Sequence, residues 1–499
     1  MSRKLLEQHE AAMAKAQSYD EWKAIALAHD RASGAQEWKE SDPSRSYDYL
    51  SIRNRLDQLR DLRRRRADRE LLFTLNEGVH GNLGGMGSSR LYRRAKLGTK
   101  ALIEDYTEEV AGALEHLADP GTDAISLSEK RDFFRRASHC FGRTALMLSG
   151  SGSLFFFHLG VGKALWDQGL IPGIISGSSG GALVGSLMCT TSDEHFEEVF
   201  CPHRLAGKEP PQSWLGRFLD AVSPERMTAE DVESLLRKYM PDYTFEEAWR
   251  KTGRYMNVSV APAELMQKSR LLNADTTPNV YLREAVLASA ALPGLFAPVG
   301  LKARNDRGER CDYLASRKWV DGSLSEDLPA KRLARLYGVN HFIVSQTNPY
   351  ILPFVDGRKD SAGAWPIVRR AIMSSARTWI NTSATLFRGP LSLTPELERL
   401  SNSLLSVINQ AYSGDITIMP PTKLHNPLKL VAWRSHIEIS DMMKMGERAT
   451  WPHIEQIRIQ TRISRTLDGI QKRIEAGNPQ PLRPVKRCDQ PAAAMDVPA

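Results

Sequence analysis

The sequence predicts an α/β protein in which a largely parallel sheet is flanked in the chain by helical regions. Between residues 141 and 350, short apolar runs typical of buried strands alternate with helical patterns. The segments before and after this region instead repeat apolar residues at helical spacing. The chain has 499 residues, 41% of them hydrophobic, so it can form about two to four domains and bury a sizeable core.

The composition excludes several other classes of protein. The 35 glycines follow no triplet period, so the chain is not collagen-like, and five cysteines are too few for a disulfide scaffold. No cysteine pair has metal-ligand spacing, so no metal site is expected, and the odd count indicates a reducing compartment. Glu7 and Glu10 interrupt any apolar stretch of a signal peptide, so we expect a cytoplasmic protein.

Residues 1–140 are predicted to form a helical accessory domain. Helix formers and capping residues favour helices over 5–16 and 19–29. Leucines recur through 50–75, and helical spacing resumes over 97–117 after a glycine-rich break.

Arginine is concentrated between Arg53 and Arg69, where eight arginines stand against three aspartates and give a local net charge of +5. This run is either a basic patch that attracts anionic lipid or the solvated face of a helix. It contains no interleaved aromatic residues, and no nucleic-acid-binding module is recognisable, so no nucleic-acid partner is expected.

The core domain, residues 141–350, is predicted from strands and helices that alternate along the chain. The expected elements are a strand at 144–148, a helix at 156–168, a strand at 174–175, a helix at 182–189, and strands at 255–260 and 341–345. The uncharged segment from Gln168 to Ser192 has 25 residues, enough to span a bilayer. Eleven of them are glycine or serine, and a proline interrupts them, so a buried strand, turn and helix are expected and no transmembrane helix.

The end of the chain is predicted to be helical over 351–477 and disordered over 478–499. Ala364–Phe387 combines apolar residues near helical spacing with arginines and a tryptophan. Such a helix either docks on a lipid surface or packs on the core with its arginines in solvent. Apolar residues from Ile454 to Ile474 recur by threes and fours, apart from one skipped turn, and predict a helix that ends at Gly477.

The most informative motif is Gly177-Ser178-Ser179-Gly180-Gly181, a Gly-x-Ser-x-Gly pattern between a predicted strand and a predicted helix. A sharp turn there strains its central residue, and flanking glycines remove side chains that would clash. The hydroxyl of Ser179 would project at a helix N-terminus, where N–H groups and the helix dipole favour negative charge. The pattern predicts a nucleophile elbow; the alternative is a glycine- and serine-rich turn without chemistry.

A second glycine- and serine-rich cluster, from Ser149 to Ser153, also follows a predicted strand and precedes a helix. Its N–H groups would bind either a phosphate or an oxyanion formed at Ser179. No Gly-Lys-Ser/Thr follows, which excludes a nucleotide P-loop, and the dinucleotide fingerprint is incomplete. The separate nucleophile favours the oxyanion hole.

A nucleophilic serine also needs a base, and Asp321 is the candidate. It ends a short apolar run, Trp319-Val320, and precedes Gly322, which permits close approach of another backbone segment. The alternative is an ordinary Asp-Gly turn.

Three motifs occur in the order typical of the patatin-like phospholipase family, and together they closely resemble it. They are the glycine- and serine-rich loop with the following Phe157-His158-Leu159-Gly160-Val161, the elbow, and Asp321-Gly322-Ser323. Segments 97–103, 291–296, 339–346 and 414–418 resemble the branch that contains triacylglycerol lipases of yeast and plants. The resemblance extends over residues 19–420 and implies a patatin-like layered α/β fold for the catalytic domain at 141–350.

The resemblance also implies a function, the hydrolysis of lipid esters by a Ser–Asp dyad without histidine. Ser179 would be the nucleophile and Asp321 the base. The N–H groups of Gly150, Ser151 and Gly152 would form the oxyanion hole. Triacylglycerol is the first expected substrate and phospholipid the second. No metal or organic cofactor is implied, and a lipid substrate implies peripheral association with a membrane or lipid-droplet surface.

Two other functions stay open. An α/β-hydrolase esterase would complete a triad with His341, although this residue lies in a predicted buried strand. A catalytically weak lipid-surface binding protein is the second alternative, because Ser151 and Phe155 stand where the resemblance leads us to expect glycine. His158 is interpreted as a residue that packs the loop and not as a third catalytic group.

Overall fold

The computed structural model describes residues 3–79, 81–201, 228–264, 267–292, 296–348, 414–421 and 434–477. The chain divides into two compact units, each built from separate segments of sequence. Unit 1 comprises Met1–Glu37, Tyr92–Gly98 and Gly142–Arg458, and unit 2 comprises Trp38–Leu91, Thr99–Phe141 and Ile459–Ala499. The segment Ala364–Phe387 and the tail 478–499 lie outside the described residues.

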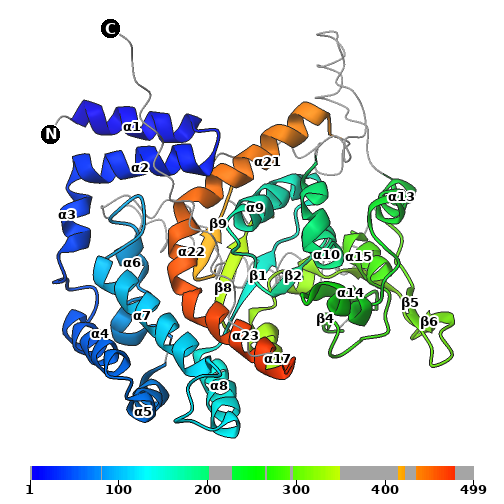
Figure 1. Ribbon diagram of the computed structural model, residues 1–499. Coiled ribbons are helices and arrows are strands. Elements are labelled where there is room, and N and C mark those ends of the chain that lie inside the picture. Colours follow the sequence, from blue (N-terminus) through cyan, green and yellow to red (C-terminus); the bar gives the residue numbers. More distant parts are fainter. Residues whose placement is uncertain are drawn as a thin grey trace, which may run out of the picture. The chain divides into compact units, whose positions relative to one another are not determined.

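Unit 1 contains a seven-stranded sheet in the order β4-β3-β2-β1-β8-β9, with β7 also paired to β3 (Figure 1). Its strands are β1 (Arg143–Leu148), β2 (Ile174–Gly177), β3 (Tyr255–Pro262), β4 (Arg270–Leu272), β7 (Trp319–Asp321), β8 (Val339–Ser345) and β9 (Ile416–Ile418). The four pairs from β3 to β9 through β2, β1 and β8 are parallel, whereas β4 and β7 run antiparallel to β3. The predicted largely parallel sheet is therefore confirmed.

Helices and a small hairpin complete unit 1. The helices are α1 (Arg3–Lys15), α2 (Tyr19–Ser33), α9 (Phe155–Asp167), α10 (Gly180–Thr190), α13 (Ala229–Tyr239), α14 (Phe245–Thr252), α15 (Leu282–Ala290), α16 (Ser323–Glu326), α17 (Ala330–Tyr337) and α21 (His436–Thr450). The hairpin pairs β5 (Leu301–Arg304) with β6 (Arg310–Tyr313). Short 3₁₀ helices lie at Gly152–Leu154, Asp193–Phe200 and Trp451–His453.

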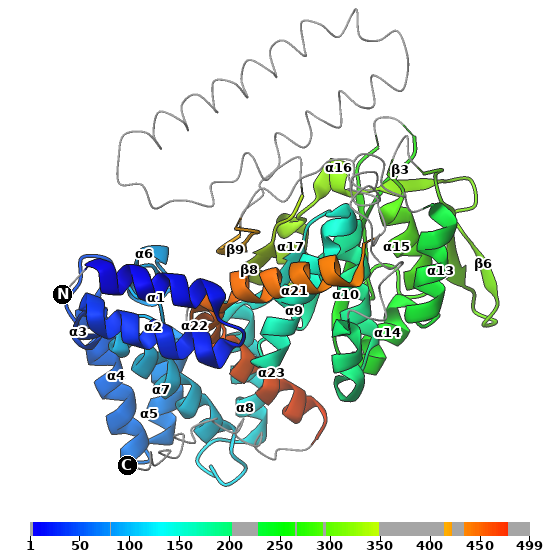
Figure 2. The ribbon, with the colours of Figure 1, turned by 90° about the horizontal axis from the view of Figure 1, so that it is seen from above.

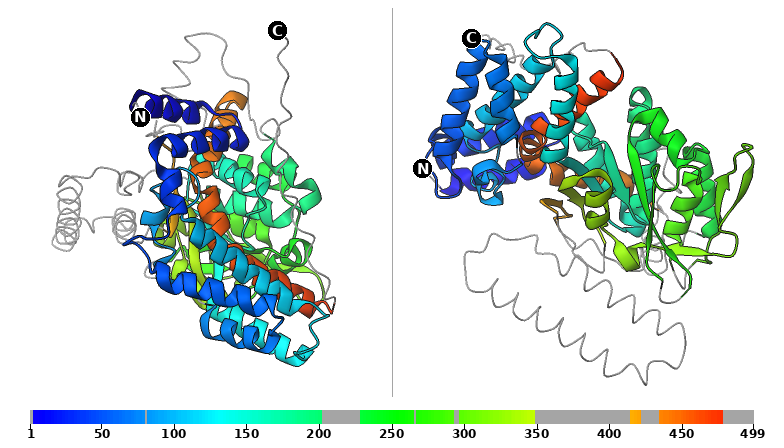
Figure 3. Two further views of the ribbon diagram at one scale, coloured as in Figure 1. Left: turned by 60° about the vertical axis from the view of Figure 1, so that its left-hand side comes forward. Right: turned by 90° about the horizontal axis from the view of Figure 1, so that it is seen from below.

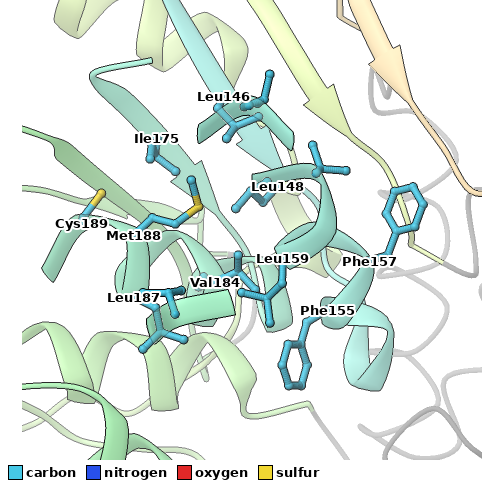
Figure 4. Packing of buried hydrophobic residues seen from close by; sticks show 14 of the residues in the cluster. Leu146, Leu148, Phe155, Phe157, Leu159, Ile175, Val184, Leu187, Met188 and Cys189 are labelled. Carbon is cyan, nitrogen blue, oxygen red and sulfur yellow. The ribbon is translucent and has the colours of Figure 1, made fainter. Parts of the chain in front are cut away.

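Both faces of the central strands are buried, which explains their nearly continuous apolar sequence. Leu146 and Leu148 of β1 join the hydrophobic cluster formed with α9 and α10 (Figure 4). The alternate residues Ala145 and Met147 point to the opposite face and join the cluster that contains Leu333 of α17. A parallel sheet covered on both faces reads as an apolar run without polar alternation.

Helix α21 packs along α9, although the two lie far apart in sequence (Figure 2). Glycine permits this close approach. A Cβ atom on Gly160 would collide with the carbonyl of Met443, and one on Gly446 would collide with the carbonyl of Phe157. A helix from the end of the chain thus supports the helix that follows the loop Ser149–Ser153.

Unit 2 is helical (Figure 3). Its helices are α4 (Tyr49–Arg64), α5 (Asp68–Gly78), α7 (Ala101–Ala118), α8 (Leu127–Phe141) and α23 (Arg462–Glu475), with a 3₁₀ turn at Leu83–Gly85 and a short α6 (Ser89–Tyr92) whose last residue belongs to unit 1. Helix α7 packs against α4, α5 and α23. The leucine repeat predicted over 50–75 forms two helices, because the chain leaves the helix at Arg66, which has φ = 54°.

The arginine run of unit 2 is extensively paired with carboxylates. Its ion pairs are Arg53–Asp42, Arg60–Asp105, Arg63–Glu109, Arg64–Asp61, Arg65–Asp61 and Arg69–Glu129. Leu56, Leu59 and Leu62 occupy the buried side of the same helix. These contacts favour the interpretation of the run as the charged outer face of a helix.

The remaining helices are α3 (Ala35–Glu40) and α22 (Ile454–Gln460), which each cross a unit boundary in the sequence. The predicted helix ending at Gly477 consists of α22 and α23, and the break at Thr461 coincides with the skipped turn of the apolar pattern. No helix among the described residues is both long enough and apolar enough to cross a membrane.

Candidate active site

Ser179 occupies the sharp turn between β2 and α10. Its backbone has φ = 52° and ψ = −124°, a conformation that residues with a side chain rarely adopt. A Cβ atom on Gly177 would collide with the carbonyl of Gly181, and one on Gly181 would collide with the carbonyl of Leu148. The turn therefore has the strained backbone and the glycine-dependent packing that a nucleophile elbow needs.

A hydroxyl from another helix holds the strained residue. Ser289 of α15 accepts a hydrogen bond from the N–H of Ser179 at 2.9 Å and donates its own proton to the carbonyl of Ser259 at 2.8 Å. The buried N–H at the elbow is thus satisfied outside the helix. Sequence reasoning missed Ser289, which stands among alanines and carries no signal that links it to the elbow.

Asp321 ends β7, directly beside β3. In the register of these strands it pairs with Val260, and Gly322 lies so close to Ser259 that a Cβ atom would be 2.5 Å from the carbonyl carbon. The carboxylate is buried, and its Oδ1 accepts the N–H of Ser323 at 2.8 Å. Its Oδ2 has no hydrogen-bond partner within the described part of the chain.

The hydroxyl of Ser179 faces this carboxylate. Burial raises the pKa of Asp321 to about 6, against the lowering effects of hydrogen bonds from Ser323 and of the Ser179 hydroxyl. The hydroxyl therefore lies near enough to lower the pKa of the Asp321 carboxyl, although Oδ2 has no hydrogen-bond partner among the described residues. A loose contact of this kind is common before substrate binds.

The loop from Ser149 to Ser153 lies against the elbow. A Cβ atom on Gly180 would collide with the hydroxyl of Ser151 and would lie 2.8 Å from the carbonyl of Gly152. Of the three predicted oxyanion donors, Gly150 already donates its N–H to Oδ1 of Asp327, at 2.7 Å. The N–H groups of Ser151 and Gly152 have no acceptor among the described residues.

Phe155 lies at the start of α9, just beyond this loop. Its ring is buried, is tilted by 33° against that of Phe156 with 4.0 Å between centroids, and belongs to the hydrophobic core (Figure 4). Its bulk is therefore accommodated by the core of unit 1.

His158 lies in α9 and contacts the loop, in line with its interpretation as a residue that packs the loop. Its Nε2 lies 3.0 Å from the carbonyl of Ser149, and its Nδ1 lies 2.7 Å from the hydroxyl of Ser345. Burial lowers the pKa of His158 to about 4, so the ring is neutral at physiological pH.

His341 lies at the wrong end of the sheet for a catalytic triad. It pairs in register with Thr144 near the start of β1, and its Nδ1 lies 3.2 Å from the hydroxyl of Thr144. The elbow follows the other end of the strands, where Leu148 pairs with Ser345. Four strand residues separate the two levels, which is about 13 Å. This geometry argues against the esterase with a His341 triad.

Residues that could bind a metal are not gathered in the part of the chain that the structure describes. No three side chains of His, Cys, Asp or Glu there are arranged to hold a metal ion.

Known proteins are similar to both parts of the chain. The model of the patatin-like phospholipase family matches residues 146–334, and a domain of unknown function, DUF3336, matches residues 2–139. A triacylglycerol lipase of Schizosaccharomyces pombe, ptl2, is 32% identical over 469 residues, which are 91% of this chain and 74% of that protein.

Other relatives are longer than this chain. A patatin-like phospholipase domain-containing protein of Cryptococcus neoformans is 32% identical over 477 residues, and the match covers 91% of this chain but only 53% of the relative. A protein of the same description from Aspergillus niger is 32% identical, with 94% of this chain and 66% of the relative covered. The chain thus spans about half the length of some relatives. The resemblance that the loop, the elbow and the Asp-Gly-Ser motif carry is confirmed, and the chain belongs to the patatin-like phospholipase family.

Proposed function

We propose that this protein is a serine lipid acyl hydrolase in which Ser179 and Asp321 form a catalytic dyad. The observation that best supports the proposal is the buried Asp321 carboxylate. Its Oδ2 has no hydrogen-bond partner among the described residues, and the hydroxyl of Ser179 lowers its pKa. A desolvated carboxylate with a raised pKa beside a hydroxyl on a strained turn is suited to accept its proton.

In the first half of the reaction, the Oγ of Ser179 attacks the carbonyl carbon of the ester. The hydroxyl proton moves to Asp321, and the carbonyl oxygen becomes an oxyanion that the N–H groups of Ser151 and Gly152 stabilise. When the intermediate collapses, the ester C–O bond breaks, and the proton on Asp321 passes to the leaving alcohol. An acyl group remains on Ser179.

In the second half, water attacks the acyl group. Asp321 accepts a proton from the water, a second oxyanion forms in the same N–H site, and its collapse breaks the bond to Oγ. The proton returns to Ser179, and a fatty acid leaves. Gly150 is given a different role from the one predicted, because its N–H is engaged by Asp327.

A lipid ester is the proposed substrate, with triacylglycerol first and phospholipid second. One relative is named as a triacylglycerol lipase, and others carry the name of the patatin-like phospholipase domain. The protein is proposed to work in the cytoplasm and to bind membrane or lipid-droplet surfaces peripherally.

Covalent labelling tests the dyad directly. A fluorophosphonate probe should label the wild-type protein, and Ser179→Ala should abolish both labelling and release of fatty acid from emulsified triacylglycerol or phospholipid vesicles. A wild-type protein that is folded and remains unlabelled would support the alternative of a lipid-surface binding protein. Labelling that survives Ser179→Ala would contradict the choice of nucleophile.

Surface binding has its own test in Ala364–Phe387. Trp379→Ser combined with Ile372→Ser should weaken binding to anionic liposomes and spare hydrolysis of a soluble short-chain ester. A joint loss of thermal stability and of both activities would instead make this segment part of the core.

A further inference from the structure

A second buried carboxylate, Asp327, connects three segments of the candidate active site. Its Oδ1 accepts the N–H of Gly150 at 2.7 Å, and its Oδ2 accepts Nδ2 of Asn348 at 3.1 Å. Its backbone carbonyl accepts the hydroxyl of Ser178, the residue before the nucleophile, at 3.1 Å. One residue thus touches the oxyanion loop, the segment after β8, and the elbow.

We propose that Asp327 is a positioning residue for the hydrolysis proposed above, on which this inference rests. By holding the N–H of Gly150, its carboxylate orients the next two peptide groups, so that the N–H groups of Ser151 and Gly152 face the oxyanion. Asp327 itself touches neither substrate nor the reacting atoms.

The rest of the loop is held at its two ends. Ser149 accepts a hydrogen bond from the N–H of Thr347 through its hydroxyl, at 2.9 Å, and its carbonyl meets His158. At the other end, the guanidinium of Arg434 donates two hydrogen bonds to the hydroxyl of Ser153, at 3.1 and 2.9 Å. Asp327 acts between these ends, at the peptide next to the two donors.

The chemistry explains why an aspartate suits this position. A carboxylate offers two acceptor oxygens, so it can accept the N–H of Gly150 and the amide of Asn348 together. An asparagine at 327 has only one acceptor oxygen, and its amide group would turn a donor toward Gly150 or Asn348. A buried donor left without an acceptor is unfavourable, and the loop would shift to satisfy it.

The cost of this arrangement is electrostatic. Burial raises the pKa of Asp327 to about 7, and the charge of Asp321 adds to the rise, while the hydrogen bonds from Gly150 and Asn348 lower it. The charge of the proposed base thus opposes ionisation of Asp327, the carboxylate that holds Gly150. Its retention is understandable if the loop geometry that it maintains is needed in the transition state.

The test exchanges donor and acceptor between the two partners. Asp327→Asn should lower kcat for a soluble short-chain ester by about tenfold or more and change KM by less than about twofold, since a small misplacement of oxyanion donors acts on the transition state. Asn348→Asp alone, which sets two carboxylates against each other, should be at least as damaging. The double variant Asp327→Asn/Asn348→Asp restores both hydrogen bonds and should recover most of kcat.

Thermal unfolding of all four proteins separates positioning from stability. Recovery of kcat in the double variant supports the proposal even where Asp327→Asn fails to fold. An unchanged kcat in folded Asp327→Asn, or a folded double variant without recovery, would overturn it. Failure of the proposed function is distinguishable, because the wild-type protein would then lack esterase activity and fluorophosphonate labelling before any change at 327.

Discussion

Charged side chains have different environments in helical unit 2 and at the candidate active site. On α4, Arg64 pairs with Asp61 at 2.6 Å while 78% and 41% of their side chains are exposed. At the site, Asp321 and Asp327 are buried and accept N–H groups, and burial raises the pKa of both carboxyls. Exposed ion pairs lose little hydration and contribute little to the free energy of unfolding, whereas burial of a charged carboxylate opposes folding. Groups that oppose folding in this way indicate where chemistry is performed.

The largest expected effect comes from removing the dyad. Ser179→Ala and Asp321→Asn should each lower kcat by at least about 10³-fold, and the double variant should be scarcely worse, because residues that act as one unit are not additive. Steady-state kinetics on a soluble ester measures all three losses. Losses that multiply in the double variant would mean that the two residues act independently and that the dyad assignment is wrong.

The next effect tests the contact between elbow and loop. Gly180→Val should lower kcat by about 10²-fold, because the new side chain would displace Ser151 and Gly152, the proposed oxyanion donors. Gly173→Ala is the matched control, since an added Cβ there meets no atom within 4 Å. Circular dichroism checks that both variants fold. Equal activities of the two folded variants would show that the loop does not contribute donors.

Burial of the ionised Asp321 carboxylate opposes folding, so replacing this residue should have opposite effects on activity and on stability. The pKa of Asp321 is raised from 3.8 to about 6, so its burial favours the neutral form. Its contribution to stability is fully present below pH 3.8 and is lost as pH rises through about 6. Asp321→Asn, which stays neutral, should therefore be inactive yet more stable at pH 8, by up to about 3 kcal/mol.

Urea unfolding at pH 5 and pH 8 measures this difference, and the gain should be larger at pH 8. The same pKa predicts that kcat/KM of the wild-type protein falls as pH drops through about 6, because the base must be ionised. An Asp321→Asn variant that is less stable than the wild type at pH 8 would contradict the account of the buried charge.

The parts of the site that the sequence could predict are those with local causes. The elbow at Ser179 and the Asp-Gly-Ser turn depend on glycines next to the functional residue, so a short sequence motif is enough to predict them. Ser289 and Asp327 act on residues 110 and 177 positions away, and no local pattern encodes such contacts. Their roles appear only when the chain is folded.

The same distinction holds for the fold. Strands β1, β2, β3 and β8 lie in the interior of the sheet and are largely buried, so their apolar runs could be recognised in the sequence. Strands β5 and β6 have only four residues each, and the residues of β6 are largely exposed, so their hairpin carries no such signal. The helix break at Arg66 was also missed, because arginine has good helix propensity and its left-handed conformation has no sequence mark.

The weakest effects are expected in the arginine run of unit 2. Arg64→Gln should change the free energy of unfolding by less than about 0.5 kcal/mol, because its pair with Asp61 is exposed. Arg63→Gln should cost more, about 1–3 kcal/mol, because its partner Glu109 is only 7% exposed and would be left buried with a weaker partner. Neither variant should alter kcat.

If the run were instead a lipid-docking patch, each lost arginine would weaken binding to anionic vesicles by about 1 kcal/mol, or roughly fivefold. Vesicle sedimentation with Arg64→Gln and Arg65→Gln decides between these outcomes, and we expect unchanged binding since both arginines pair with Asp61.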